Sequence, residues 1–187
     1  VRVDRHGGAT QLDVAHLLPG RAAGGEHRGW EILPPVPCHD PDLDFGQLVQ
    51  SLEEELERNR LAMSAESQQD RAILVSVVSQ ADGTDKDALQ ASLNELRELA
   101  YASGVTPVDA IVQRQRQINP KYLIGKGKLS EIVLRALQFG VDLLIFDQDL
   151  NPSQVRSLTD TTELRVIDRT QLILDIFAQR AKSREGK

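Results

Sequence analysis

Apolar and polar positions repeat with two different periods along most of this chain. Between residues 72 and 168, short apolar runs rich in β-branched residues alternate with longer stretches in which apolar side chains recur at helical spacing. The short runs are typical of buried strands, and the longer stretches are typical of amphipathic helices. The sequence predicts strands at 72–78, 107–117, 141–146 and 164–167. It predicts helices near 87–102, 128–139, 152–160 and 170–182.

The ends of these helices carry recognisable signals. Gly104 and Gly140 follow the first two helices, where glycine commonly closes a helix. Asn151, Pro152 and Gln154 predict a capping box with proline in the first helical turn. Strands that alternate with helices indicate an α/β fold with a mainly parallel four-stranded sheet built from βα units and right-handed crossovers. Open sheets of this kind often bind ligands beyond the carboxyl ends of their strands.

The amino-terminal quarter has a different character. Residues 1–46 are rich in Gly, Pro and His, and they predict an irregular extension or the remnant of an upstream domain. Short apolar pieces at 14–18 and 30–33 are candidates for edge strands. Residues 44–62 show helical periodicity with acidic residues on the other face, and Asp44 is a candidate cap. This segment predicts an amphipathic connector helix that packs on the domain behind it.

Composition and charge narrow the class of protein. The chain of 187 residues is 40% hydrophobic, which is enough for one packed α/β domain with a flanking segment. It has no apolar run of about 18 residues and no signal peptide pattern, so we expect a cytoplasmic protein without a membrane partner. Its first residue, Val1, suggests a sequence that begins within a longer protein.

The net charge of −6 is unevenly distributed. Residues 107–187 carry 13 basic and 10 acidic side chains, whereas residues 1–106 carry 9 and 18. A net negative charge ordinarily disfavours binding to nucleic acid. This does not apply to the carboxyl-terminal half, because that half is net positive.

The first basic cluster lies between the second strand and the second helix. Lys121, Lys126 and Lys128 flank Gly125 and Gly127 at the predicted start of a helix. Glycine allows the backbone to approach a partner closely, and the free N–H groups of a helix start favour anions, so a phosphate is the natural partner. The alternative is a glycine turn flanked by solvated lysines.

The second basic cluster lies at the end of the chain. Arg180, Lys182, Arg184 and Lys187 follow a dense apolar helix. Such a helix end suits phosphate contacts, but positive charges also favour the negative end of the helix dipole. Residues 183–187 carry no capping signal, so we expect the helix to continue beyond them.

Two other groups suggest metal or acid–base chemistry. Asp147 and Asp149 follow the third strand and lie close enough to hold a divalent cation or to share a proton. The position of Asp149 just before a helix start favours stabilisation of free N–H groups instead. Cys38 precedes His39 and Asp40, but no further ligands occur at zinc-site spacings, which favours a plain loop. We therefore assign no catalytic and no metal-binding residue.

Three segments together resemble one known family. They are NPKYLIGKGK at 119–128, LNPSQ at 150–154 and DRTQLILDIFAQRA at 168–181. Their content and order are similar to those of the amino-terminal domain of HflX-type ribosome-associated GTPases. The clear resemblance covers residues 72–187, with the domain itself at 72–182 and the start of a truncated continuation at 183–187.

The resemblance implies a ribosome-binding function. It implies that this domain contacts the RNA of the large ribosomal subunit and acts in ribosome splitting or rescue, and that a GTPase domain with GTP and Mg²⁺ follows it. No Gly-x-x-x-x-Gly-Lys-Ser/Thr segment occurs in the chain, so we expect it to bind no cofactor and to hydrolyse no GTP by the family's mechanism. One alternative is an ATP-binding domain that uses residues 125–128 to bind phosphate and Asp147 or Asp149 to bind magnesium. A second alternative is a regulatory domain that packs on the parent protein's own GTPase domain.

The candidate RNA- or phosphate-binding residues combine both basic clusters with neighbouring positions of the family segments. They are Lys121, Tyr122, Gly125, Lys126, Gly127, Lys128, Arg169, Arg180, Lys182 and Arg184.

Overall fold

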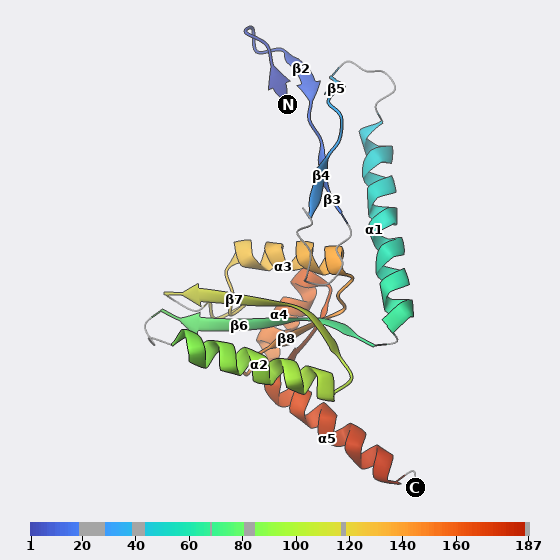
Figure 1. The fold of residues 1–187 in the computed structure, drawn as a ribbon. Helices are drawn as coiled ribbons and strands as arrows, with labels where there is room; N and C mark the ends of the chain where they lie inside the picture. The colour runs from blue at the N-terminus through green and yellow to red at the C-terminus, as the bar shows by residue number, and fades with distance from the viewer. Residues whose placement is uncertain (19–28, 39–43, 68, 81–84, 117–118, 186–187) are drawn as a thin grey trace.

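The structure, a computed structural model, describes residues 1–18, 29–38, 44–67, 69–80, 85–116 and 119–185. An α/β domain forms the carboxyl-terminal part, and an extension of short strands and one long helix projects from it (Figure 1). Within the described residues, no helix combines the length and the apolar character that crossing a membrane requires.

The α/β domain is built on a parallel four-stranded sheet, as the sequence predicts. Its strands run β7-β6-β8-β9 in space, and every neighbouring pair is parallel. The strands are β6 (Arg71–Ser79), β7 (Thr106–Gln115), β8 (Leu143–Phe146) and β9 (Arg165–Asp168). Of these four strands, β6 is the first along the chain, yet it lies in the middle of the sheet. The next strand, β7, is added on one side of β6, and β8 and β9 are added on the other side.

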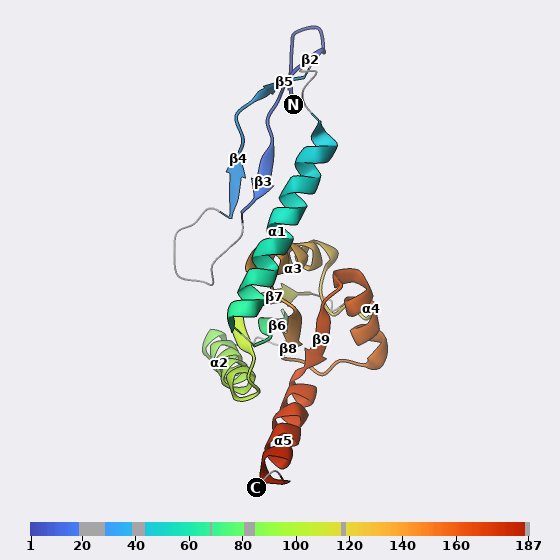
Figure 2. The same ribbon diagram turned by 90° about the vertical axis from the view of Figure 1, so that its right-hand side faces the viewer.

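Four helices cover the two faces of this sheet. They are α2 (Lys86–Ala102), α3 (Lys126–Phe139), α4 (Pro152–Thr162) and α5 (Arg169–Glu185). Helices α3 and α4 pack on one face, and α2 and α5 pack on the other (Figures 1 and 2). All four predicted helices are confirmed, and α5 extends three residues beyond its predicted end because the helix continues through the basic segment to Glu185.

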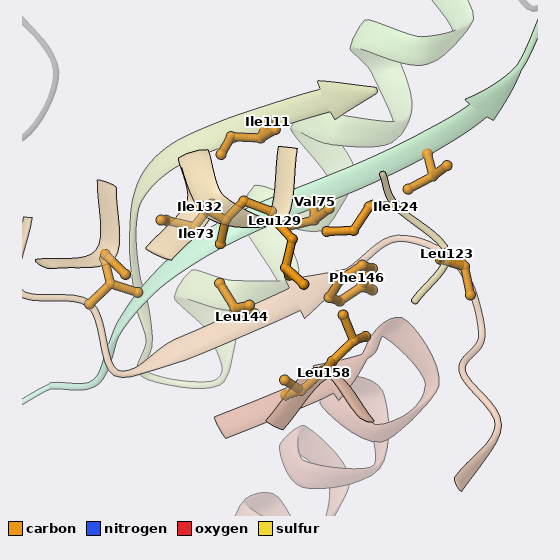
Figure 3. Close-up of a cluster of buried hydrophobic side chains, with 14 of the residues drawn as sticks. Ile73, Val75, Ile111, Leu123, Ile124, Leu129, Ile132, Leu144, Phe146 and Leu158 are labelled. Carbon is orange, nitrogen blue, oxygen red and sulfur yellow. The ribbon is translucent and has the colours of Figure 1, made fainter. Parts of the chain in front are cut away.

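Alternation along β6 divides the core into two clusters. Ile73, Val75 and Val77 face α3 and α4, whereas Ala72 and Leu74 face α2 and α5. Both sets are buried because the strand lies in the middle of the sheet with helices on both faces, which explains why its sequence is almost continuously apolar. Phe146 of β8 completes the first cluster among Ile124, Leu129 and Leu158 (Figure 3).

The predicted caps have their expected geometry. The Asn151 side chain accepts a hydrogen bond from the backbone N–H of Gln154, and the Gln154 side chain accepts one from the backbone N–H of Asn151, both at 2.9 Å. Gly140 ends α3 in the left-handed conformation with φ of 59°. Asp44 accepts a hydrogen bond from the N–H of Gln47 at the start of the connector helix.

The extension is more regular than predicted. Two small antiparallel sheets form within residues 1–37, where the sequence indicates irregular structure. The strands are β1 (Arg2–Val3), β2 (Ala9–Leu12), β3 (Ala15–Leu17), β4 (Trp30–Ile32) and β5 (Val36–Pro37). Strands β3 and β4 lie within the two candidate edge strands at 14–18 and 30–33, whereas the other three strands, of two to four residues, are too short to show a period in the sequence. The connector helix α1 (Phe45–Ser67) ends five residues beyond its predicted end and contacts α3.

Candidate functional site

A tight turn leads from β7 into α3 and carries the first basic cluster. The Asn119 side chain accepts hydrogen bonds from the backbone N–H groups of Lys121, at 2.9 Å, and Tyr122, at 3.1 Å. The N–H of Leu123 donates to the Asn119 carbonyl at 2.9 Å. Leu123 has a φ of 58°, which is unusual for a residue with a side chain. Its side chain and that of Ile124 are buried, so core packing holds the backbone in this conformation.

Two glutamines at the end of β7 fix the far side of the turn. Gln115 donates to the Leu123 carbonyl at 3.1 Å, and the Gln113 side chain accepts the N–H of Gly125 at 3.0 Å. Gln115 also donates to Gln113 at 2.8 Å, so the two side chains form one unit. Our sequence reasoning missed both residues. The available signal was their spacing of two, which places both side chains on one face of a strand.

The second family segment supports the turn from α4. Besides closing the capping box, Gln154 donates from its amide nitrogen to the carbonyl of Pro120 at 3.0 Å. Two segments separated by thirty-four positions therefore meet at one side chain. The turn is held by four side-chain amides and two buried apolar residues, so it is a rigid feature of the domain.

The three lysines of the turn differ in their surroundings. The Lys121 amine lies 4.9 Å from the centre of the Tyr122 ring. Lys126 is exposed, and neither lysine forms an ion pair within the described part of the chain. Lys128, by contrast, donates to Glu131 at 2.5 Å, and this contact lowers the pKa of the Glu131 carboxyl. Lys121 and Lys126 are therefore the available cations, and the charge of Lys128 is balanced.

Tyr122 connects the cations of this turn electrostatically. Hydrogen bonding to Lys121, and then to Thr161 of α4, lowers the pKa of its phenol, and the charge of Lys126 contributes in the same direction. Lys121 and Lys126 therefore act on the same phenol oxygen.

The glycines of the turn have ordinary backbone geometry. Gly125 has a φ of −73°, and Gly127 is not among the residues with positive φ, so neither position requires glycine for its backbone conformation. A Cβ at Gly125 would lie 3.1 Å from the Gln113 amide nitrogen, whereas one at Gly127 would meet no atom within 4 Å. Gly125 therefore permits close packing inside the protein, and Gly127 leaves its surface open.

The aspartates at the carboxyl ends of the strands take part in internal contacts. Asp147 accepts hydrogen bonds from Ser92 at 2.8 Å and from Arg169 at 3.1 Å, and Arg169 also pairs with Glu95. The Arg169 side chain is only 24% exposed, so it bridges α5, β8 and α2 rather than projecting into solvent. This pairing raises the pKa of the Arg169 guanidinium, first through Glu95 and then through Asp147.

Two further aspartates order the loops around α4 and α5. Asp149 accepts a hydrogen bond from the Thr170 hydroxyl at 2.7 Å, while Asn151, not Asp149, caps α4. Asp168 accepts the N–H groups of Leu150, at 3.0 Å, and Gln171, at 2.8 Å. Among the described residues, no group of three or more His, Cys, Asp or Glu side chains has the geometry to hold a metal ion. Cys38 is partly buried, and His39 and Asp40 lie outside the described residues.

The two basic clusters do not share a surface. The turn lies on the α3–α4 side of the sheet, whereas Arg180 and Lys182 lie on the projecting end of α5, which starts on the opposite face (Figures 1 and 2). Both residues are exposed. The side chain of Arg184 lies outside the described residues. A single flat ligand therefore cannot contact both clusters.

Comparison with known proteins identifies the kind of domain. Residues 90–178 match the family described as "GTP-binding GTPase N-terminal". The chain is similar to the protein named GTPase HflX of Caldanaerobacter subterraneus subsp. tengcongensis, with 39% identity over 117 residues, which is 63% of this chain and 26% of that protein. It is similar to GTPase HflX of Escherichia coli, with 40% identity over 118 residues, or 63% and 26% of the two chains.

A solved structure shows a weaker likeness. It is that of a GTP-binding protein from the archaeon Sulfolobus solfataricus in complex with GDP, with 21% identity and a TM-score of 0.44 over 59% of this chain and 30% of the other. The present chain spans about a quarter of the length of the curated relatives it matches. On the sequence matches, residues 90–178 of this chain are similar to the domain described as GTP-binding GTPase N-terminal, as in an amino-terminal fragment of an HflX-type GTPase.

Proposed function

We propose that this domain is the RNA-contacting part of a HflX-type GTPase that associates with the large ribosomal subunit. In this role it would help to dock the protein during ribosome splitting or rescue, while a GTPase domain elsewhere in the full protein would bind GTP and Mg²⁺. The observation that carries the proposal is the rigid turn that presents Lys121 and Lys126 without balancing carboxylates among the described residues.

Rigidity is important because phosphate contacts position a protein on RNA. A lysine on a mobile loop loses conformational freedom when it binds a phosphate, whereas this turn is already held by Asn119, Gln113, Gln115 and Gln154. The net charge of −6 opposes RNA binding only at long range, because screening limits its effect to about 8 Å at physiological salt.

The structure changes the expected number of phosphate contacts. Three lysines would each neutralise one phosphate, but Lys128 is already paired with Glu131. Removal of Lys121 and Lys126 should therefore reduce the slope of log K against log salt by about 1.4–1.8, depending on whether the RNA is single- or double-stranded. Removal of Lys128 alone should change this slope little.

The direct test is co-sedimentation of the chain with large ribosomal subunits at about 50 and 200 mM salt. Lys121→Ala/Lys126→Ala is compared with Lys86→Ala/Arg156→Ala, a variant that removes the same charge from two other exposed positions. We expect the first variant to lose binding and salt dependence and the second to retain both. Equal binding by the two folded variants would refute the proposal.

The alternative of a nucleotide-hydrolysing domain gains no support from the site. Asp147, which that alternative assigns to magnesium, is 9% exposed and is engaged by Arg169 and Ser92. RNA contact is supported instead by Lys121 and Lys126, which have no balancing carboxylate among the described residues.

A further inference from the structure

A pocket lies next to the lysine turn, in the groove between α3 and α4. Its volume is about 500 Å³, which falls within the range of about 300–1,000 Å³ typical of small-molecule sites. Tyr122 from the turn and Thr161 from α4 form two of its sides. The remaining wall is the face of α3 that carries Leu129, Val133 and Leu134.

The pocket combines an apolar interior with a basic edge. Leu129 is buried below it, and Leu134, which is 47% exposed, leaves apolar surface open to solvent. Lys126 lines the pocket, and Lys121 lies beside it over the ring of Tyr122. None of the described residues that line it carries a carboxylate. A ligand suited to this lining combines an apolar body with a negative group.

A second pocket of similar size shows that this charge balance is specific to the first. It has a volume of about 530 Å³ and lies between α4, β9 and α5. Asp160, Asp168 and Arg156 line it, so its edge is net negative. An anionic ligand would be repelled there and attracted beside the turn.

We propose that the pocket between α3 and α4 binds an unpaired base of an RNA strand, with the adjoining phosphates on Lys121 and Lys126. Unpaired bases bind in apolar or aromatic pockets in most sequence-selective RNA recognition, because their faces and edges are not occupied by a helix. Ser130 and Thr161 line the pocket and offer hydroxyl groups to the edges of such a base.

The charge pattern favours a nucleotide within a strand over a free one. A strand places a phosphate on both sides of the base, and the turn has two available lysines five positions apart. A free nucleoside triphosphate is ordinarily bound with magnesium, which one or two carboxylates hold beside the phosphates, and none of the described residues that line this pocket is a carboxylate.

This inference rests on the proposed function, and the experiment separates the two. The whole chain is titrated with three probes: a short single-stranded oligoadenylate that contains a fluorescent adenine analogue, an RNA duplex of equal length, and ATP with magnesium. Ser130→Phe fills the pocket without changing charge, and Leu134→Gln makes its exposed wall polar. Ala91→Phe adds the same ring to an exposed position of α2, on the other face of the sheet, as the matched control. Circular dichroism verifies folding of each variant.

Wild-type protein should bind the single strand several-fold more tightly than the duplex, with a change in fluorescence of the analogue. Ser130→Phe and Leu134→Gln should remove this preference while they leave duplex binding intact, and Ala91→Phe should behave as wild type. Single-strand binding that survives in both pocket variants would overturn the inference and leave the proposed function standing. Equally tight binding of ATP would also overturn it, by showing that the pocket serves a free nucleotide. Failure of the wild type to bind either RNA would overturn the proposed function itself.

Discussion

Arg169 offers the sharpest test of how this domain is held together. The sequence places it among candidate RNA contacts, but its guanidinium donates to Asp147 at 3.1 Å and to Ser92 at 3.4 Å and pairs with Glu95. Arg169→Met keeps an unbranched chain as far as the position of Nε and removes these donors. The Asp147 carboxylate, only 9% exposed, would then lose its cationic partner.

The expected loss of stability follows from these contacts. A hydrogen bond to a charged group contributes about 1.5–3 kcal/mol, and removal of one partner of a fully buried ion pair costs about 3–5 kcal/mol. Asp147 keeps its 2.8 Å hydrogen bond from Ser92, so we expect Arg169→Met to lower the free energy of unfolding by about 1.5–3 kcal/mol. The Glu95 contact should add less, because that side chain is 63% exposed and therefore well screened by solvent.

Urea denaturation of the variants measures this effect. Arg169→Met, Asp147→Asn and the double variant form a cycle, and we expect a coupling of about 0.5–3 kcal/mol, since the double variant leaves no buried charge unpaired. Folded Arg169→Met should still co-sediment with ribosomal subunits as wild type does. A loss of stability below about 0.5 kcal/mol, the usual effect of a surface substitution, would refute the reasoning.

Three other predictions concern the turn and the helices beside it. Gly127→Ala should stabilise the protein by up to about 1 kcal/mol in thermal unfolding, because the added methyl meets no atom. Gly125→Ala should destabilise it by about 0.5–1.5 kcal/mol, because the added methyl displaces the Gln113 side chain. If Gly125→Ala were the more stable of the two variants, the result would contradict the geometry. Asn151→Ala should cost about 1 kcal/mol through loss of the cap, measured by urea denaturation, and an unchanged midpoint would show that the cap is dispensable. Lys128, and after it Arg135, keep the pKa of the Glu131 carboxyl below 4.5, so the stabilisation that this carboxylate provides is present above pH 4.5 and is lost as pH falls. Glu131→Gln should remove this part of the loss of stability in acid. Identical stability profiles of the variant and the wild type between pH 3 and 7 would contradict the prediction.

Much of the fold follows from local patterns in the sequence. Glycine and asparagine signals at Gly140 and Asn151 predict the helix ends, and the continuous apolar run of β6 predicts a central strand. These features are readable because they depend on residues a few positions apart. In the extension, the apolar pieces at 14–18 and 30–33 are readable as candidate strands, but their pairing with each other is not, because it joins segments that no local pattern links.

The site is only partly predictable for the same reason. The basic segment is visible in the sequence, but the balance of charge is not: Lys128 is paired across one helical turn, and Arg169 is paired with Glu95, which lies seventy-four positions away. The support of the turn by Gln113 and Gln154 also depends on tertiary structure. No pattern within the turn reveals that α4 closes a pocket beside it.

The position of β6 has a consequence for how this protein emerges from the ribosome that synthesises it. Ala72 pairs with Leu143, about seventy residues later, so one edge of the central strand has no partner until β8 has been translated. At about 5–20 residues per second, this interval lasts roughly 4–14 s. Throughout it, the apolar segment 72–78 can pair only with β7, and its other edge is open to any extended chain nearby. The risk of aggregation through the open edge of β6 therefore ends only when β8 has been synthesised and can pair with that edge.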